Sequence, residues 1–141
     1  MSQENVEAVR RAYEGAQEFM RDPEGTGPYL DFLDPEIEWI GPREFPDLAE
    51  PHHGHEGVRR YLRTLFDALD DYRMVPEEFI DAGPDQVLVF SREGGRGKGS
   101  GAEVITQPTA HLWTLRDGKA IRMKSYWERD DALRAAGLAQ S

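Results

Sequence analysis

The last third of the chain constrains the fold most, because residues 111–127 form one long hairpin pattern around the turn sequence Arg116-Asp117-Gly118-Lys119. Gly118 supplies the positive φ angle that a type I turn with a glycine bulge requires, and the resulting three-residue loop places Leu115 opposite Lys119. Side chains alternate between the two faces of a strand, so this register turns His111 toward the core. The predicted inward face carries His111, Trp113, Leu115, Ile121, Met123, Ser125 and Trp127.

A two-residue turn of type I′ over Asp117 and Gly118 is the alternative for this hairpin. It would shift the register by one residue and place His111 beside Arg122 and Lys124 on a polar outer face. We favour the bulged turn, because it gathers the large apolar side chains on one face and sends both cations to the other.

The composition predicts a globular protein with a small ligand. A chain of 141 residues, 38% hydrophobic and 31% charged, fits a single domain over residues 1–141. Its net charge of −10 would repel nucleic acid, which we therefore do not expect as a partner. No apolar run approaches the ~20 residues of a membrane span, and the polar N-terminus resembles no secretion signal. We expect a cytoplasmic protein that binds no membrane. The absence of cysteine excludes disulfides and thiol nucleophiles.

Apolar spacing along the chain predicts helices first and a strand meander last. The predicted helices cover residues 2–20, 29–33, 55–69 and 130–136, and the predicted strands cover 36–40, 73–81, 86–93, 103–115 and the second arm of the hairpin. Residues 41–54, with three prolines, are predicted to be a loop, and the glycine-rich run 94–101 a flexible hairpin loop. This order indicates an α+β fold with helices on one face of a curved antiparallel sheet.

Four motifs in sequence carry a family resemblance: VRRAY at 9–13, FLDPEIEW at 32–39, GHEGVRRYL at 54–62, and the hairpin at 111–127. Their order and spacing resemble the SnoaL-like family of the NTF2-like superfamily, which includes polyketide cyclases and relatives of the ketosteroid isomerases. The resemblance implies a cone-shaped α+β barrel, in which a strongly curved sheet wraps the helices around a deep cavity. It also implies a homodimer, whereas the reaction stays open between isomerases, cyclases, dehydratases, epoxide hydrolases and non-catalytic binders.

Three residues are candidates for catalysis. Tyr13 matches the tyrosine that donates a hydrogen bond to the enolate in ketosteroid isomerases, but the aspartate base of those enzymes falls on Ile40. The resemblance also implies a catalytic aspartate in the hairpin, whose place falls on Ala110 without a gap or on His111 with one residue gapped in the turn. The bulged register favours His111, which would act there as an acid or base. Arg92 shares a strand face with Leu88 and Phe90. If that face points inward, its guanidinium stabilises a ligand anion.

Each candidate also has a purely structural interpretation. His111 is then a core histidine hydrogen-bonded to backbone or to Tyr13, and Tyr13 is a core side chain. Arg92 is then a strand-end residue that reaches solvent or pairs with Glu93 or Glu103. We expect Glu93 and the other acids of this region at a strand end or on the outer face. A hydrolase that uses two acids around an arginine therefore ranks low.

A small apolar or aromatic molecule is the expected ligand, because large aromatic side chains are predicted to line the cavity. The predicted ligand-binding residues are Trp39, His53, Phe90, Trp113, Met123, Ser125 and Trp127. The three histidines at 52, 53 and 55 lack a completing metal motif, so we expect a solvated loop, no metal and no cofactor. A homodimer would cover Leu112, Tyr126 and Val89, which we expect on the outer sheet face.

Two classes of function follow. One is a cofactor-independent isomerase, cyclase or hydrolase that uses His111, Tyr13 and Arg92 on an apolar or aromatic substrate. The other is a non-catalytic domain for small-ligand binding or dimerisation. The first requires polar groups that converge in a roomy cavity, and the second requires at most one polar group that its neighbours already satisfy.

Overall fold

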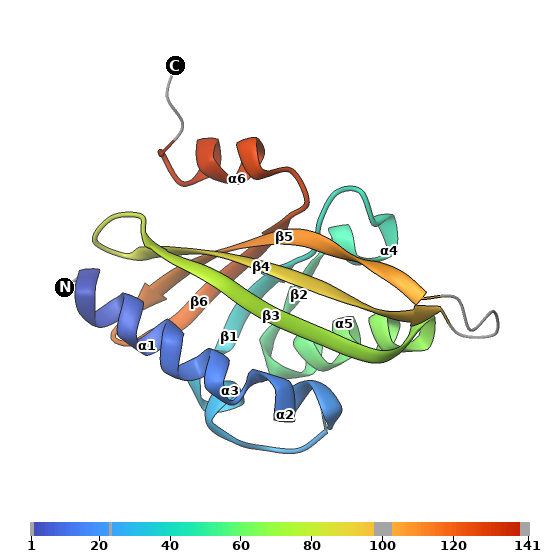
Figure 1. Ribbon diagram of the computed structural model, residues 1–141. Helices are drawn as coiled ribbons and strands as arrows, with labels where there is room; N and C mark the ends of the chain where they lie inside the picture. Colours follow the sequence, from blue (N-terminus) through green and yellow to red (C-terminus); the bar gives the residue numbers. More distant parts are fainter. Residues whose placement is uncertain (1, 23, 98–102, 139–141) are drawn as a thin grey trace.

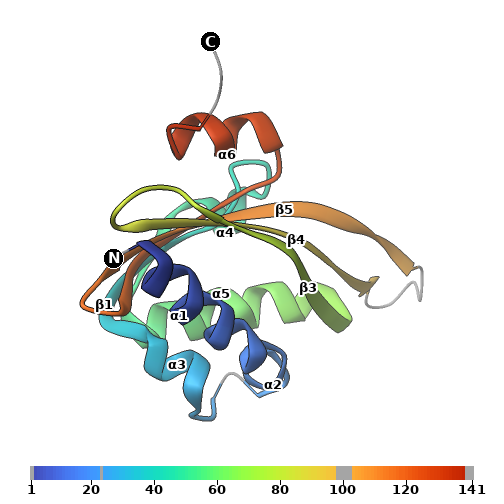
Figure 2. The same ribbon diagram turned by 60° about the vertical axis from the view of Figure 1, so that its left-hand side comes forward.

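A curved six-stranded sheet separates the helices into two layers in the computed structural model, which describes residues 2–22, 24–97 and 103–138 (Figure 1). The elements are α1 (Ser2–Glu14), α2 (Ala16–Arg21), α3 (Pro28–Phe32), β1 (Leu33–Ile40), α4 (Pro46–Ala49), β2 (Pro51–His53), α5 (Gly54–Ala68), β3 (Leu69–Asp81), β4 (Gln86–Gly97), β5 (Glu103–Arg116), β6 (Lys119–Tyr126) and α6 (Arg129–Ala135). Helices α1, α2, α3 and α5 lie under one face, and α6 lies over the other (Figure 2). The predicted α+β class is confirmed.

The sheet is mixed rather than antiparallel, and it is open. Its strand order is β2-β1-β6-β5-β4-β3, and β1 runs parallel to β6 while every other neighbouring pair is antiparallel. Strand β1 precedes β6 in the chain, and the elements from α4 to β5 form the connection between these two parallel strands. The sheet curves around the helices but does not close into a barrel.

Several helix and strand boundaries differ from the predictions, and two of these differences add elements. The first predicted helix is divided at Gly15, where α1 ends and α2 begins. The predicted loop 41–54 contains the short helix α4 and the edge strand β2. Gly41 explains part of this order, because its N–H donates to the Leu48 carbonyl at 2.9 Å and a Cβ there would lie 2.3 Å from the same oxygen. The prolines therefore lie at the ends of short elements and do not prevent these elements from forming.

The hairpin turn is the two-residue type I′ turn that we did not favour. Asp117 and Gly118 have φ angles of 54° and 79°, and Arg116 pairs with Lys119 across the turn. The predicted three-residue bulged turn is therefore wrong. Type I′ turns suit Asp-Gly because their twist matches that of the flanking strands.

His111 nevertheless faces the core, because a β-bulge compensates for the turn. The register shifts between Thr114 and Leu115, so that Ile121 is the additional residue of strand β6. The bulge restores the parity of the strand pair, and His111 lies opposite Ser125 with both side chains buried. The predicted inward orientation of His111 is correct, but it results from the turn and the bulge together.

The main core lies between the sheet and the helices beneath it. Trp113 is at its centre and contacts the rings of Tyr13, Tyr29, Phe32 and Trp39, with centroid distances between 5.5 and 6.4 Å. Helices α1 and α5 supply apolar residues at helical spacing, which gives each of them one buried face. The polar residues of the interior pack against this aromatic cluster.

A second apolar cluster lies on the opposite sheet face, under α6. It consists of Leu88, Phe90, Ala110, Leu112, Ala132 and Ala136. Leu112 is therefore covered by this protein's own helix, and Val89 faces the main core. Both residues were wrongly predicted to lie on an uncovered outer face. The homodimer stays a prediction from family resemblance alone.

Two other features bear on the sequence predictions. Within residues 2–22, 24–97 and 103–138, no helix is long and apolar enough to cross a membrane. Residues 94–97 of the predicted glycine-rich loop belong to strand β4, so the prediction is wrong there, and residues 98–101 lie outside the described residues.

The type I′ turn predicts the effect of substitutions at Asp117. We expect Asp117→Ala to lower the free energy of unfolding by about 1 kcal/mol, because a positive φ angle crowds a Cβ against the following carbonyl. Asp117→Asn should be neutral or stabilising, because Asn tolerates this conformation. Urea unfolding of both variants checks this. Equal stability of the two variants would contradict the type I′ assignment.

Candidate functional site

A chain of buried polar side chains crosses the interior between α1 and the sheet. The Tyr13 hydroxyl from α1 lies 2.7 Å from Nδ1 of His111, and the indole Nε1 of Trp113 donates to the same hydroxyl oxygen at 2.8 Å. On the other side of the ring, His111 Nε2 lies 3.3 Å from Oε1 of Glu93 on β4. Tyr72 from β3 donates its hydroxyl to that carboxylate oxygen at 2.5 Å. Four elements thus meet at one acid and one imidazole.

The hydrogen-bond donors and acceptors among these side chains determine the tautomer of His111. The Tyr13 oxygen accepts from Trp113, so the Tyr13 proton is available for Nδ1 of the imidazole. Nε2 then carries the ring proton and donates it to Glu93. Burial raises the pKa of Tyr13 well above its ordinary value, so that this hydroxyl stays a donor at neutral pH. Every polar atom between Trp113 and Glu93 has a partner.

Glu93 is held as a carboxylate despite its surroundings. Burial alone would raise the pKa of Glu93, but the electrostatic attraction of the His111 ring and hydrogen bonds from His111, Tyr72 and Thr109 outweigh it and lower the pKa below its ordinary value. Burial and the neighbouring Glu93 charge raise the pKa of Tyr72 well above its ordinary value. The Glu93 side chain is 22% exposed and that of His111 is 5% exposed. Glu93 is therefore the more accessible titratable group of the pair.

A small inner chamber lies against Glu93 and His111. Its volume is about 10 Å³, and its lining includes the aromatic residues Tyr29, Trp39, Tyr61, Tyr72 and Trp113 together with Met123 and Ser125. This volume holds about one water molecule. Trp39 is 3% exposed, and its indole N–H has no hydrogen-bond partner among the described residues. The chamber thus combines a carboxylate acceptor with an unsatisfied donor.

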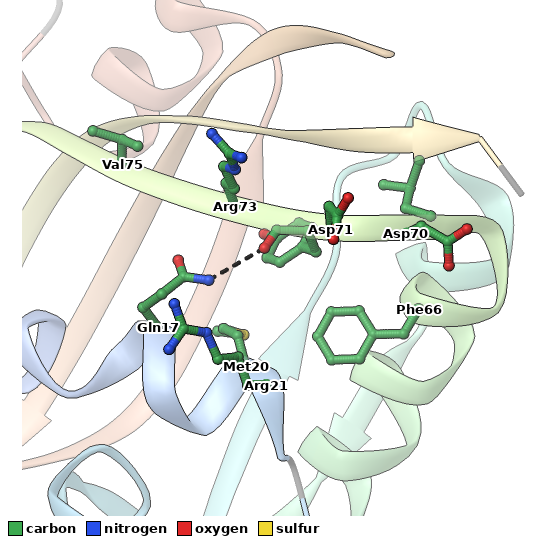
Figure 3. A pocket seen from close by; sticks show the side chains of 10 residues that line it. Gln17, Met20, Arg21, Phe66, Asp70, Asp71, Arg73 and Val75 are labelled. Atoms are coloured by element: carbon green, nitrogen blue, oxygen red, sulfur yellow. Dashed lines mark hydrogen bonds between the residues drawn. The ribbon is translucent and has the colours of Figure 1, made fainter. Parts of the chain in front are cut away.

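A much larger outer pocket, of about 680 Å³, opens beside the chamber between α2, the end of α5 and the start of β3 (Figure 3). Met20 and Tyr72 line both spaces and therefore form the wall between them. Gln17 fixes this region, because its amide donates to the Tyr72 carbonyl at 3.2 Å and accepts from the Met74 N–H at 3.4 Å. The side chain of Gln17 thereby pairs with the free edge of β3 as a neighbouring strand would.

The structure brings several of the predicted site residues together. Trp39, His111, Trp113, Met123 and Ser125 all line the inner chamber. Tyr13 lies behind His111 and contacts it directly. His111 is hydrogen-bonded to Tyr13, as its structural interpretation predicts, but it also contacts a carboxylate, which that interpretation does not include.

Arg92 does not enter the interior, and of its two interpretations the structure agrees with a strand-end residue that reaches solvent. Its side chain is half exposed, and its Nε lies 3.2 Å from Oε2 of Glu77. The cause is the register between β4 and β5, which pairs Val89 with His111. Directly paired residues share a face, so Val89 and every second residue after it, including Glu93, face inward.

Glu93 is the functional residue that sequence reasoning missed. If Leu88 and Phe90 are the inward residues of β4, strand alternation places Glu93 on the outer face. Both strand faces are apolar, since α6 covers one of them, and the alternation therefore gave no unique answer. The signal that could have found Glu93 was the pairing of β4 with the histidine-bearing strand β5.

Three predicted ligand-binding residues lie away from the chamber. Phe90 lies under Arg129, whose guanidinium carbon is 3.8 Å from the ring centroid. Phe90 and Trp127 line a separate hollow of about 250 Å³ at the outer sheet face. His53 is exposed at the end of β2.

The other histidines have structural contacts. His55 lies 2.8 Å from the Leu33 carbonyl through Nε2, and the ring of His52 packs edge-on against Tyr61. Within the described residues, no group of three or more histidine, aspartate or glutamate side chains is arranged to hold a metal ion.

Comparison with known proteins agrees with this architecture. The α+β fold is that of NTF2-like proteins, and the family profile of the SnoaL-like domain matches residues 9–123. The chain belongs to the SnoaL-like family. No curated protein sequence matches it.

Similar solved structures cover nearly the whole chain. TerC, co-crystallised with polyporic acid, is 29% identical with a TM-score of 0.74 over 95% of this chain and 98% of its own. An NTF2-like protein of unknown function from Burkholderia pseudomallei is 23% identical, with a TM-score of 0.74 over 93% and 95% of the two chains. A protein assigned as a SnoaL-like polyketide cyclase from Jannaschia sp. CCS1 is 23% identical, with a TM-score of 0.69 over 99% and 94%. The last two likenesses concern the fold alone.

The Tyr13 hydroxyl should be worth more to stability than that of another core tyrosine. We expect Tyr13→Phe to lower the free energy of unfolding by about 2 kcal/mol, because it leaves His111 and Trp113 with unpaired buried groups. The matched control is Tyr29→Phe, which removes a buried hydroxyl without a hydrogen bond to the described residues. Similar losses in both variants, measured by urea unfolding, would contradict the assigned network.

The lowered pKa of Glu93 predicts a pH-dependent contribution to stability. A carboxylate whose folded-state pKa is depressed stabilises the fold above its unfolded pKa of about 4.3 and loses that contribution as the pH falls through the folded value. The stability difference between wild type and Glu93→Gln should therefore be largest at neutral pH and shrink on acidification. Glu77→Gln, at an exposed ion pair, is the control and should give a small, nearly constant difference. Parallel stability curves for wild type and Glu93→Gln would exclude the lowered pKa.

Proposed function

We propose that this protein is a cofactor-independent enzyme that moves a proton on an apolar or aromatic small molecule, in a reaction of the isomerase, cyclase or hydrolase type. The observation that carries the proposal is the contact between Glu93 and His111 at an aromatic chamber. Such reactions require an acid or base held in a dry site beside the substrate, and convergent titratable groups in a cavity are its usual signature.

Glu93 is the proton acceptor in this proposal, and His111 supports it. Glu93 takes a proton from a C–H or O–H group of the substrate, and the electron pair of the broken bond stays on the substrate as an enolate or phenolate. His111 keeps its Nε2 proton directed at the carboxylate, while Tyr13 fixes the opposite ring nitrogen. Return of the same proton to another substrate atom completes an isomerisation without oxidant or reductant. Arg92 has no part in this scheme.

The substrate reaches Glu93 by replacing the Tyr72 hydroxyl. The chamber, at about 10 Å³, is too small for a ring system, whereas the outer pocket of about 680 Å³ is large enough. Tyr72 belongs to both spaces and already donates to the carboxylate that the substrate would contact. Rotation of this one side chain would join the two spaces. The Trp39 N–H then becomes a donor for an oxygen of the substrate.

The similarity to TerC supports an aromatic ligand. That protein was co-crystallised with polyporic acid and is 29% identical over nearly its whole length. The chamber walls of the present chain carry five aromatic rings, which suit flat apolar surfaces. Polyporic acid is therefore the first compound to test for binding.

A non-catalytic small-ligand-binding domain is the second candidate. The observation that favours it is the complete pairing of Tyr13, His111, Glu93 and Tyr72 with one another, together with the small chamber. In that case the polar chain holds the fold together, and only the apolar surfaces meet the ligand.

Proton exchange distinguishes the two candidates without knowledge of the natural substrate. We expect wild type to accelerate deuterium incorporation from D₂O into 2-indanone, an aromatic ketone with acidic C–H bonds, as followed by mass spectrometry. Glu93→Gln should lose this acceleration roughly 100-fold or more, because it removes the general base. Glu77→Gln should keep it.

Binding is measured in parallel, so that a missing reaction is not mistaken for missing binding. The chain has three tryptophans, and Trp127→Phe leaves fluorescence from Trp39 and Trp113 alone, both at the chamber. Quenching by 2-indanone or polyporic acid without Glu93-dependent exchange would favour the binding domain and contradict the proposed enzyme.

A further inference from the structure

The side-chain amide of Gln17 connects α2 to the free edge of β3. Its Nε2 donates to the Tyr72 carbonyl at 3.2 Å, which is the dashed line in Figure 3, and its Oε1 accepts from the Met74 N–H at 3.4 Å. Strand β3 is at the end of the strand order, so no further strand in the described part of the chain pairs with this edge. These two hydrogen bonds, the Gln17 clamp, hold the backbone on both sides of Arg73 and set the position of Tyr72 relative to α2.

The sheet itself holds Tyr72 less firmly than a regular strand would. The pairing of β3 with β4 shifts register between residues 70 and 73, so that Asp71 and Tyr72 lie opposite Gly95 alone. This arrangement is a β-bulge, whose extra residue is left out of the hydrogen-bond ladder. Asp71 has a φ angle of 53°, in the left-handed region that the first residue of one class of bulge adopts. The clamp therefore acts at the point where the pairing between the strands is interrupted.

Tyr72 also separates Glu93 from the outer pocket. Its hydroxyl donates to Glu93 Oε1 at 2.5 Å, and the residue lines both the chamber and the pocket. Met20 is the other residue that lines both spaces, and it lies on α2, as Gln17 does. Helix α2 begins after Gly15, which separates it from α1. One short helix thus supplies part of the wall and holds the backbone of the rest.

We propose that Gln17 is a positioning residue, whose clamp keeps the Tyr72 hydroxyl on Glu93 and determines how readily the chamber opens to the outer pocket. In the closed state the carboxylate is hydrogen-bonded to Tyr72. When the clamp is released, the bulge lets the Tyr72 backbone move, and the ring leaves the carboxylate to the substrate. The inference rests on the proposed function, because it names the residue that regulates access to the same site.

The test observes Tyr72 directly, by ¹⁹F NMR of protein labelled with 3-fluorotyrosine. The chain has five tyrosines, and Tyr72→Phe identifies the Tyr72 signal by its loss. Relaxation dispersion measures the population of a second, released state of the labelled ring on the microsecond-to-millisecond timescale. Gln17→Met keeps the size of the side chain but removes both hydrogen bonds. It should raise the released population about fivefold, because each bond has a modest net strength.

Two further variants connect this signal with the two ends of Tyr72. Glu93→Gln replaces the charged acceptor with a weaker neutral one, and it should populate the same released state with the same chemical shift. Gln17→Glu keeps an acceptor for the Met74 N–H but cannot donate to the Tyr72 carbonyl, so it should behave as Gln17→Met does. This second substitution of Gln17 keeps the test decisive if Gln17→Met fails to fold.

The matched control is Asn5→Leu. Asn5 on α1 also donates its side-chain amide to a backbone carbonyl, that of Pro84, at 3.0 Å. Loss of this bond should leave the Tyr72 signal unchanged. The inference would be overturned by a released population that is the same in wild type and the Gln17 variants, or that rises equally in Asn5→Leu.

Failure of this inference is distinguishable from failure of the proposed function, because the NMR measurement contains no substrate. Glu93-dependent deuterium exchange together with an unchanged Tyr72 signal in the Gln17 variants would support the enzyme and reject the role of Gln17. A Gln17-dependent released state without Glu93-dependent exchange would support the positioning role in a protein that only binds its ligand.

Discussion

The contact between Glu93 and His111 is the interaction on which the interior of this protein depends. A carboxylate removed from water is costly unless it is hydrogen-bonded, and Glu93 obtains donors from His111, Tyr72 and Thr109. Those donors come from different strands, so the carboxylate is satisfied only when β3, β4 and β5 are in register. Tyr13 extends the requirement to α1. The network therefore couples the position of the first helix to the pairing of the sheet, and the same coupling fixes the geometry of the candidate site.

The sequence predicted the fold class and the facing of His111, but it did not predict the identity of its acidic partner. Helix and strand patterns were clear because each long helix has one apolar face. The register of the hairpin was harder to predict, because the type I′ turn and the bulge at Ile121 shift it in opposite directions and the two shifts cancel. Only the turn could be read from local residues. A bulge is selected by the packing of both strands against the core, which no short window of sequence contains.

Strand β4 shows a second limit of sequence reasoning. Its two faces are both apolar, because the main core covers one face and α6 covers the other. Alternation therefore permitted two opposite facings, and the choice of Leu88 and Phe90 as inward residues exchanged the places of Arg92 and Glu93. The resemblance to the SnoaL-like family gave the overall architecture and drew attention to His111. It gave no information about Glu93, because an acid at that strand position was not part of the pattern that we compared.

The arrangement of one chamber behind one pocket agrees with chemistry that must exclude water. The reacting group would meet Glu93 in an aromatic enclosure, while the rest of the ligand stays in the outer pocket. Tyr72 is the residue that the two spaces share. It closes the chamber, and its hydroxyl donates a hydrogen bond to the Glu93 carboxylate. A protein that only held its fold together through this network would not need a pocket on the far side of that tyrosine.

The most direct test of the network is the ¹⁵N spectrum of the imidazole groups in histidine-labelled protein. The chain has four histidines, so the signals of His111 can be assigned with a single His111 variant. Our account predicts that His111 at neutral pH has its proton on Nε2, with Nδ1 accepting from Tyr13, and that Tyr13→Phe disturbs this state. A proton on Nδ1, or signals averaged between the two tautomers, would contradict the account.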